Sequence, residues 1–215
     1  MTRPPDRKRL TREESRAQTR ERLLDAGRQL VVANGYGGAS LRDIAAQAGY
    51  SQGAFYSNFA SKEALLLELL RQHMGAQEAQ LTALMAAPQT PEQMLAQLDR
   101  WARTLNQDAD WCTLSIELQL HAHRSQAFAV EYQKVWDAHR AALGEFIGQL
   151  FDALGHVPPA SPEELAAGFM ALSHGLALQA VATRTETSGR LIMVLLRGLI
   201  ASAADAPGGA GRADR

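Results

Sequence analysis

The stretch Ser40–Phe59, S-L-R-D-I-A-A-Q-A-G-Y-S-Q-G-A-F-Y-S-N-F, has the pattern of two short helices joined by a tight turn. Its first half repeats apolar residues at i, i+3, i+4 and i+7, which gives one apolar helical face. Ser40 can cap this first helix, and Gly49 can end it by adopting a positive φ. Ser51 can cap the second helix. The stretch therefore predicts a helix, a turn and a second, shorter helix.

The second helix is too short to be stable by itself. Phe55 and Phe59 are four residues apart, so both can face a supporting core while the polar residues between them face elsewhere. A short helix held out from a core in this way is typical of a helix-turn-helix. In that motif the second helix enters the major groove of DNA.

Composition limits the class of protein. The chain has 215 residues, of which 46% are hydrophobic and only 6% aromatic. This length fits one large domain or two small ones, and the abundance of Ala and Leu favours helix. A single cysteine, Cys112, excludes an internal disulfide and fits a reducing cytoplasm. No apolar run reaches the roughly 18 residues of a membrane span, and the basic N-terminus lacks the apolar core of a secretion signal.

Charge is unevenly distributed along the chain. Residues 1–63 hold 11 Lys and Arg against 7 Asp and Glu, whereas residues 64–215 hold 11 against 16. The positive excess therefore accompanies the helix-turn-helix, where phosphate would be met. The alternative is a solvated basic face without a partner.

Start and stop signals divide the chain into about nine helices with no convincing strand. Helices are predicted from Thr11 to about Ala33, within 40–59, from Ser61 to about Met85, from Thr90 to about Leu105, from Asp108 or Asp110 to about His121, from Ser125 to about Leu154, from Ser161 to about Ala182 and from Ser188 to about Ala203. The predicted fold is all-α. Its parts are a flexible basic arm (1–10), a three-helix DNA-binding domain (11–60), a helical ligand-binding and dimerisation domain (61–204) and a disordered tail (205–215).

Residues 19–66 resemble the DNA-binding domain of the TetR family of bacterial transcription regulators. The resemblance is carried by Arg22–Ala26, Gly35–Tyr36, Ala39–Leu41, Ile44–Ala45, Ala48–Tyr56, Phe59 and Lys62–Leu66. It covers about a quarter of the chain, and the combined pattern is far more specific than a lone helix-turn-helix. The rest of the chain is similar to the family's second domain in length and helix order alone.

The resemblance implies a cytoplasmic homodimeric repressor that leaves its DNA operator when a small molecule binds the larger domain. The resemblance also implies that the protein is not an enzyme, and no cofactor is predicted. Carried over by position, the groove-facing residues would be Ser51, Gln52, Gly53, Tyr56 and Ser57, and the phosphate-facing residues Ser40 and Lys62. Tyr50 and Asn58 depart from the residues common in the family, which weakens any inference about the operator sequence.

Each of these side chains has a physical reason to meet DNA. Gln52 can pair its donor and acceptor with an adenine edge, and Tyr56 can donate to a phosphate oxygen. Gly53 lets the helix approach the DNA backbone closely, and Lys62 brings charge to a helix N-terminus. The alternatives are an exposed glutamine, a half-buried tyrosine and a surface lysine.

Bulky and polar residues of the second domain are candidates for a ligand cavity, because pockets in helical bundles are mainly apolar with a few polar anchors. The predicted ligand-binding residues are Trp101, Trp111, Glu117, His121, Phe128, Tyr132, Trp136, Phe169 and His174, with Met170 and His139 as further candidates. Most of the aromatic ones would equally serve as core, and the polar ones as internally hydrogen-bonded residues. Glu117 and His121 share a helix face, but two residues do not make a metal site.

The last predicted helix is apolar nearly all round from Leu191 to Ile200. A helix of this kind is buried on two sides, and for a terminal helix the second side is most simply another subunit. The last two helices therefore predict a homodimer, the alternative being one deeply buried helix in a monomer. Ala166, Phe169, Met170, Ser173 and Leu176 would complete a two-fold bundle.

Two other classes of protein are possible. A helical enzyme is disfavoured, since no nucleophile–base pair, phosphate loop or metal cluster appears in the sequence. The alternative is a helical protein-interaction module whose helix-turn-helix does not bind DNA.

Overall fold

The computed structural model describes residues 11–86, 90–105, 109–183 and 188–204. Within these ranges the chain forms nine α-helices and no strand, which confirms the all-α prediction. The predicted arm, the predicted tail and Asp108 lie outside the described residues. Among the described helices, none combines the length and apolar character required to cross a membrane.

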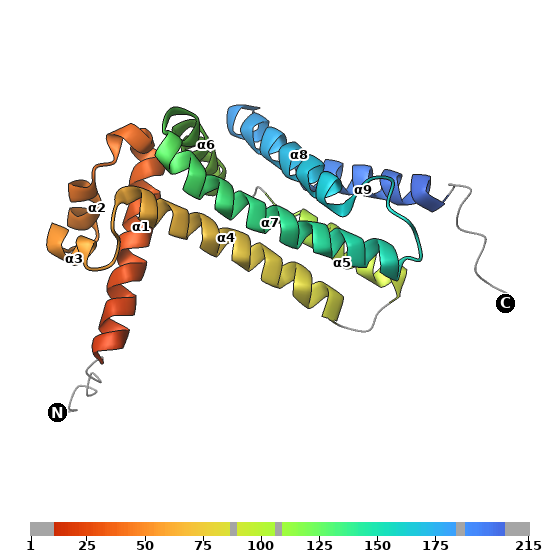
Figure 1. Cartoon of the computed structure of the whole chain (residues 1–215), viewed down its shortest axis with the longest axis horizontal. Helices are drawn as coiled ribbons and strands as arrows, with labels where there is room; N and C mark the ends of the chain where they lie inside the picture. The colour runs from red at the N-terminus through yellow and green to blue at the C-terminus, as the bar shows by residue number, and fades with distance from the viewer. Residues whose placement is uncertain (1–10, 87–89, 106–108, 184–187, 205–215) are drawn as a thin grey trace, which may run out of the picture. The chain divides into compact units, whose positions relative to one another are not determined.

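The chain divides into two compact units, one up to Leu69 and one from Leu70 onward. The helices, coloured along the chain in Figure 1, are α1 (Arg12–Gly38), α2 (Leu41–Gln47), α3 (Gln52–Tyr56), α4 (Lys62–Ala86), α5 (Pro91–Ala102), α6 (Ala109–Arg124), α7 (Gln126–Ala153), α8 (Pro162–Thr183) and α9 (Ser188–Ala204). Helix α4 begins in the first unit and ends in the second, so it supplies residues to both.

Most helix starts follow the predicted capping chemistry. Thr11 and Glu14 form a reciprocal capping box at α1, and Thr90 and Gln93 form another at α5. The end of the first helix differs from the prediction. Helical residues continue to Gly38 beyond an interruption at Gly35, which has a φ of 73°. A positive φ is inexpensive for glycine, so the chain turns there and resumes a short helical segment.

The first unit is built on α1, which packs against α2, as α2 does against α3. The side chains of Leu23, Ile44, Phe55 and Leu65 are completely buried, so all four helices contribute to one core. Gly27 allows a close approach within this core. A Cβ on Gly27 would lie 2.6 Å from a methyl carbon of Leu65, so a larger residue would displace that side chain.

The second unit is a helical bundle in which α7 packs on α6 and α8, while α9 packs on α5 and α8 (Figure 1). Its larger cluster of buried residues is Leu81, Met94, Leu98, Ala102, Leu150, Met193 and Leu196, from α4, α5, α7 and α9. Ile147, Phe151 and Ala166 join α7 to α8 in a second cluster. Burial of this apolar surface stabilises the bundle. A cavity lies among the helices of the bundle.

Candidate DNA-binding surface and ligand cavity

The turn between α2 and α3 has the predicted geometry. Gly49 has a φ of 80°, and the Tyr50 amide donates back to the Ala45 carbonyl at 2.8 Å. Ser51 then caps α3 by accepting from the Ala54 amide at 3.2 Å. The turn and the cap fix the direction in which the short helix α3 leaves α2.

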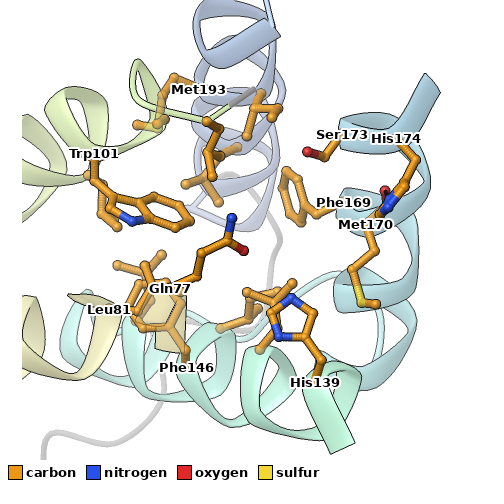
Figure 2. A pocket seen from close by; sticks show the side chains of 18 residues that line it. Gln77, Leu81, Trp101, His139, Phe146, Phe169, Met170, Ser173, His174 and Met193 are labelled. Atoms are coloured by element: carbon orange, nitrogen blue, oxygen red, sulfur yellow. Dashed lines mark hydrogen bonds between the residues drawn. The ribbon is translucent and has the colours of Figure 1, made fainter. Parts of the chain in front are cut away.

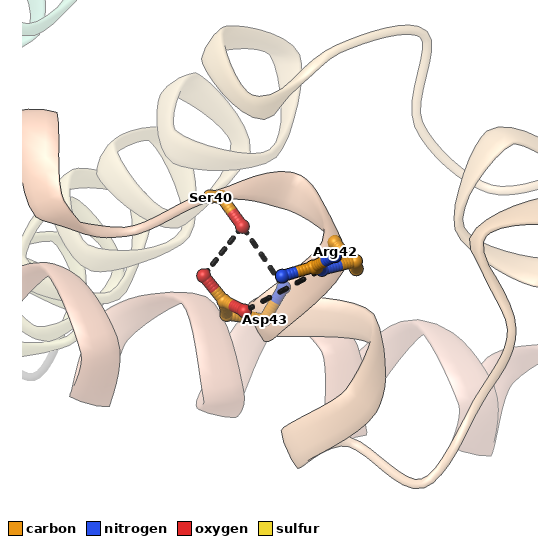
Figure 3. Close-up of polar contacts among 3 residues, drawn as sticks. All are labelled: Ser40, Arg42 and Asp43. Atoms are coloured by element: carbon orange, nitrogen blue, oxygen red, sulfur yellow. Dashed lines mark hydrogen bonds and ion pairs between the residues drawn. The ribbon is translucent and has the colours of Figure 1, made fainter.

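Ser40 caps α2, as Figure 3 shows. Its hydroxyl oxygen accepts from the Asp43 amide at 3.1 Å, while the hydroxyl donates to the Asp43 carboxylate. Arg42 lies beside this cap, with Nε 4.0 Å from an Asp43 carboxylate oxygen and with 79% of its side chain exposed. The sequence reasoning did not select Arg42, although a basic residue in the first turn of a helix-turn-helix was a visible signal.

Helix α3 presents one face to the core and another to solvent. Phe55 is fully buried, whereas the neighbouring Tyr56 is 59% exposed and its ring meets Phe55 edge-on. The other predicted groove-facing residues, Ser51, Gln52, Gly53 and Ser57, are all exposed. At Gly53, the nearest atom to an added Cβ is 3.6 Å away, so packing within the chain does not require glycine there.

Two of the residues predicted to contact DNA have polar groups that already donate hydrogen bonds within the chain. The Ser57 hydroxyl donates to the Gly53 carbonyl at 2.9 Å, which leaves its oxygen lone pairs rather than its proton available. The Lys62 ammonium donates to the Tyr36 carbonyl at 2.7 Å and the Ala39 carbonyl at 2.9 Å, and lies over the Tyr36 ring. Since an ammonium has three N–H donors, only one remains for a phosphate.

Burial lowers the pKa of Lys62, while the adjacent Glu63 acts in the opposite direction. Glu63 also accepts a hydrogen bond from the Tyr36 hydroxyl. Burial, followed by the effect of Glu63, raises the pKa of that phenol. The start of α4 is therefore tied to the end of α1 by Lys62, and the phosphate contact of Lys62 stays a prediction.

Two arginines of α1 hold the end of α3, and the sequence reasoning missed both. Arg20 donates to the Asn58 carbonyl at 2.9 Å, lies over the Phe59 ring and pairs with Glu68 at 3.4 Å. Arg16 reaches the Ser57 carbonyl at 3.4 Å. Cationic groups at the C-terminal end of a helix donate to its free carbonyls and interact favourably with the negative end of its dipole. These contacts span about forty positions, so helical periodicity gives no indication of them.

The second unit contains a partly open cavity of about 110 Å³, shown from close by in Figure 2. It is lined by Gln77, Leu81, Leu98, Trp101, Ala102, Leu105, His139, Leu143, Phe146, Ile147, Leu150, Phe169, Met170, Ser173, His174, Ile192, Met193 and Leu196. In this view Trp101 and Met193 lie on one side, and His139, Met170 and His174 lie on the other. The cavity is therefore a mainly apolar space with its imidazoles gathered at one side.

Three of the nine predicted ligand-binding residues, Trp101, Phe169 and His174, line this cavity, as do the further candidates His139 and Met170. The remaining six, Trp111, Glu117, His121, Phe128, Tyr132 and Trp136, are not among the residues that line it. They lie on α6 and on the first half of α7, and a ligand contact for them stays a prediction that this cavity does not support.

The six residues outside the cavity belong mainly to an aromatic series along α6 and α7. Phe128 has ring centroids 4.6 Å from His121 and 5.8 Å from Tyr132. Trp111 stacks on His73 at 3.8 Å. These ring contacts fit a role in the core, the alternative that the sequence left open, while a ligand-binding role for these residues stays a prediction.

Hydrogen bonds fix the two histidines of the cavity. His139 Nδ1 lies 3.0 Å from Glu78 Oε1, and His174 Nδ1 lies 2.8 Å from the Met170 carbonyl oxygen. Because carboxylate and carbonyl oxygens only accept, each Nδ1 carries a proton. Burial lowers the pKa of His174 and outweighs the opposing effect of the Met170 hydrogen bond. In the neutral imidazole of His174, Nε2 is therefore the unprotonated nitrogen and can accept a hydrogen bond.

The capped pair α2–α3, the glycine turn and the exposed face of α3 define a helix-turn-helix. Residues 23–69 match the family model described as bacterial regulatory proteins, tetR family. The matched residues lie within the first unit, which is therefore similar to the DNA-binding domain of TetR-family regulators.

Individual relatives agree with this assignment. The transcriptional repressor NemR of Escherichia coli is 34% identical over 99 residues, which are 45% of this chain and 48% of NemR. The uncharacterised regulator YwcC of Bacillus subtilis is 47% identical over 55 residues, 26% of this chain and 25% of YwcC. These alignments span less than half of either relative. Salmonella enterica GusR shares the fold, with a TM-score of 0.69 at 23% identity over 89% of this chain and 98% of GusR.

Proposed function

We propose that this protein is a homodimeric, cytoplasmic transcriptional repressor that binds a DNA operator through α3 and is released by a small, mainly hydrophobic ligand. The observation that carries the DNA-binding part is the two-sided character of α3. Phe55 is fully buried, while Tyr56, Gln52 and Gly53 are exposed. A five-residue helix held by a core and exposing polar side chains fits the major groove.

On DNA, some of the exposed residues would contact base edges and so recognise the sequence, and others would contact phosphates and so position the helix. Gln52, in the first turn of α3, would meet base edges, and Gly53 would allow a close approach. Tyr56 and Arg42 would meet phosphate oxygens, while Ser40 and Ser51 keep their capping roles. Lys62 would contribute a phosphate contact only through its remaining donor.

The ligand would bind in the cavity among α4, α5, α7, α8 and α9, in keeping with its mainly apolar lining. Helix α4 lines this cavity through Gln77 and Leu81 and begins in the DNA-binding unit. A ligand that favours one arrangement of α4 would change the spacing of the two DNA-binding units of a dimer. The change in operator affinity is limited by the ligand's differential affinity for the two states.

DNA binding is tested by titrating the purified chain onto the DNA upstream of its own gene at several salt concentrations. We expect specific retardation whose association constant falls steeply as salt rises, because lysine and arginine release counterions from phosphate. DNA of shuffled sequence is the control. Equal and weak binding to both DNAs would contradict the proposal and favour the protein-interaction module.

A further inference from the structure

The lining of the cavity indicates which charge its ligand carries. Among the described residues that line it, there is no Asp, Glu, Lys or Arg. Burying an unpaired charge is costly, so a cavity without a permanent charge selects against carboxylates and ammonium ions. Trp101, Phe146 and Phe169 supply three aromatic walls (Figure 2). An aromatic ring can pack against such walls in offset-stacked or edge-to-face arrangements.

The other histidine does not change this balance. His139 Nδ1 donates to the Glu78 carboxylate, with 3.0 Å between His139 Nδ1 and Glu78 Oε1. Glu78 does not itself line the cavity. Among the described lining residues, no Asp, Glu, Lys or Arg side chain is therefore placed at this side of the cavity to pair with an ionic ligand.

The polar groups of the lining include two acceptors, on His174 and Gln77. The His174 proton lies on Nδ1, which donates to the Met170 carbonyl, so Nε2 is the nitrogen left for a ligand. The Gln77 amide lies 2.9 Å from His73 Nε2 through its nitrogen, which leaves the carbonyl oxygen of Gln77 as an acceptor. Trp101 has its indole N–H engaged with Gln80 at 3.0 Å and therefore presents only its ring. Acceptors in an apolar cavity call for a ligand with a donor.

We propose that the cavity binds an uncharged, single-ring aromatic compound bearing a hydroxyl group, and that this hydroxyl donates to His174 Nε2. The inference rests on the proposed function only in taking this cavity as the ligand site. Its volume of about 110 Å³ is comparable with cavities of about 150 Å³ that hold benzene. The ring would lie among the aromatic walls and the hydroxyl at the side of His174.

The test measures direct binding of small aromatic probes to the full chain in the absence of DNA. Calorimetry and Trp fluorescence both monitor this binding. Para-cresol is compared with toluene and para-methylanisole, which lack the O–H donor, and with para-toluate and para-methylbenzylammonium, which carry a charge. We expect para-cresol to bind about two- to tenfold more tightly than toluene or para-methylanisole, the range of one net hydrogen bond. The two ions should bind more weakly by about tenfold or more.

His174→Phe removes the acceptor and keeps a ring beside Trp136. In this variant para-cresol should bind no better than toluene, whose affinity should be unchanged. His123→Phe, at an exposed position of α6, is the matched control and should retain the preference for para-cresol. Should His174→Phe unfold, the ¹⁵N shift of His174 Nε2 in the unaltered chain replaces it, since a donated hydrogen bond moves that resonance.

Several outcomes would overturn the inference. These are tighter binding of either ion, a preference for para-cresol that survives in His174→Phe, an unmoved Nε2 resonance, and no binding by any of the probes. The proposed function fails separately, because it is judged on DNA. A chain that binds para-cresol yet never leaves its operator contradicts ligand release alone, and release by an ionic inducer contradicts this inference alone.

Discussion

At the scale of single residues, Tyr56 offers the sharpest separation of DNA binding from folding. Its ring is 59% exposed and contacts Phe55 only by its edge, so its hydroxyl has no part in the core. Tyr56→Phe should leave the melting temperature unchanged. It should weaken operator binding by about ten- to hundredfold, since a hydrogen bond to a charged acceptor contributes about 1.5–3 kcal/mol.

The measurement for Tyr56→Phe is a mobility-shift titration alongside thermal unfolding. Tyr132→Phe is the matched control, because Tyr132 is buried in the second unit, where burial raises the pKa of its phenol to about 12. That control should retain operator affinity. An unchanged affinity for Tyr56→Phe would remove Tyr56 from the proposed DNA contacts.

The structural role of a residue could be predicted where a local sequence pattern determines it, and not elsewhere. Spacing alone placed Phe55 and Phe59 in the core and Gly49 at a positive φ. The partners of Lys62 and Arg20 could not be found in this way. Their acceptors are backbone carbonyls more than twenty positions away, and a carbonyl leaves no signature in the sequence.

At the scale of elements, Lys62 tests whether the start of α4 is held by the chain itself or by DNA. Lys62→Met keeps the apolar stem and removes the ammonium from the Tyr36 and Ala39 carbonyls. We expect the free energy of unfolding to fall by about 1–3 kcal/mol, the cost of leaving acceptors unpaired. The slope of log affinity against log salt should fall by no more than about one, because a single donor of Lys62 remains for phosphate.

Chemical denaturation measures the first quantity, and the slope of log affinity against log salt measures the second. Lys134→Met is the matched control, because Lys134 is exposed on α7 and pairs with Glu131 at 2.6 Å. It should change neither. If Lys62→Met instead reduced the salt slope by about one, the change expected when a single phosphate is no longer neutralised, and left stability intact, the phosphate role would replace the internal one.

The starts of elements were predicted well wherever a cap or a proline marks them. Thr90 with Pro91 and Ser125 both start helices where expected. The ligand cavity was predicted less well, because the residues on one helix face are known from periodicity but the neighbour of that face is not. Phe128 and Tyr132 thus occupy an aromatic series, while Phe146, a ring of the same helix, lines the cavity.

At the scale of the whole molecule, the surface of α8 and α9 is where a second subunit is proposed to bind. Leu178, Val194 and Leu195 are each at least half exposed in the single chain, although α8 and α9 pack on one another. The bundle residues proposed from sequence are used differently. Phe169, Met170 and Ser173 line the cavity, and Ala166 is buried against α7.

Leu195→Glu should convert a dimer into a monomer. In a two-fold interface the substitution occurs twice, so two carboxylates would be buried without partners. The molar mass from light scattering should halve, and operator affinity should fall because one DNA-binding unit then acts without the other. Val130→Glu is the control, since Val130 on α7 has a similar exposure of 45% and lies outside the proposed interface. A dimeric Leu195→Glu, or an unaltered chain that is monomeric at micromolar concentration, would contradict this assembly.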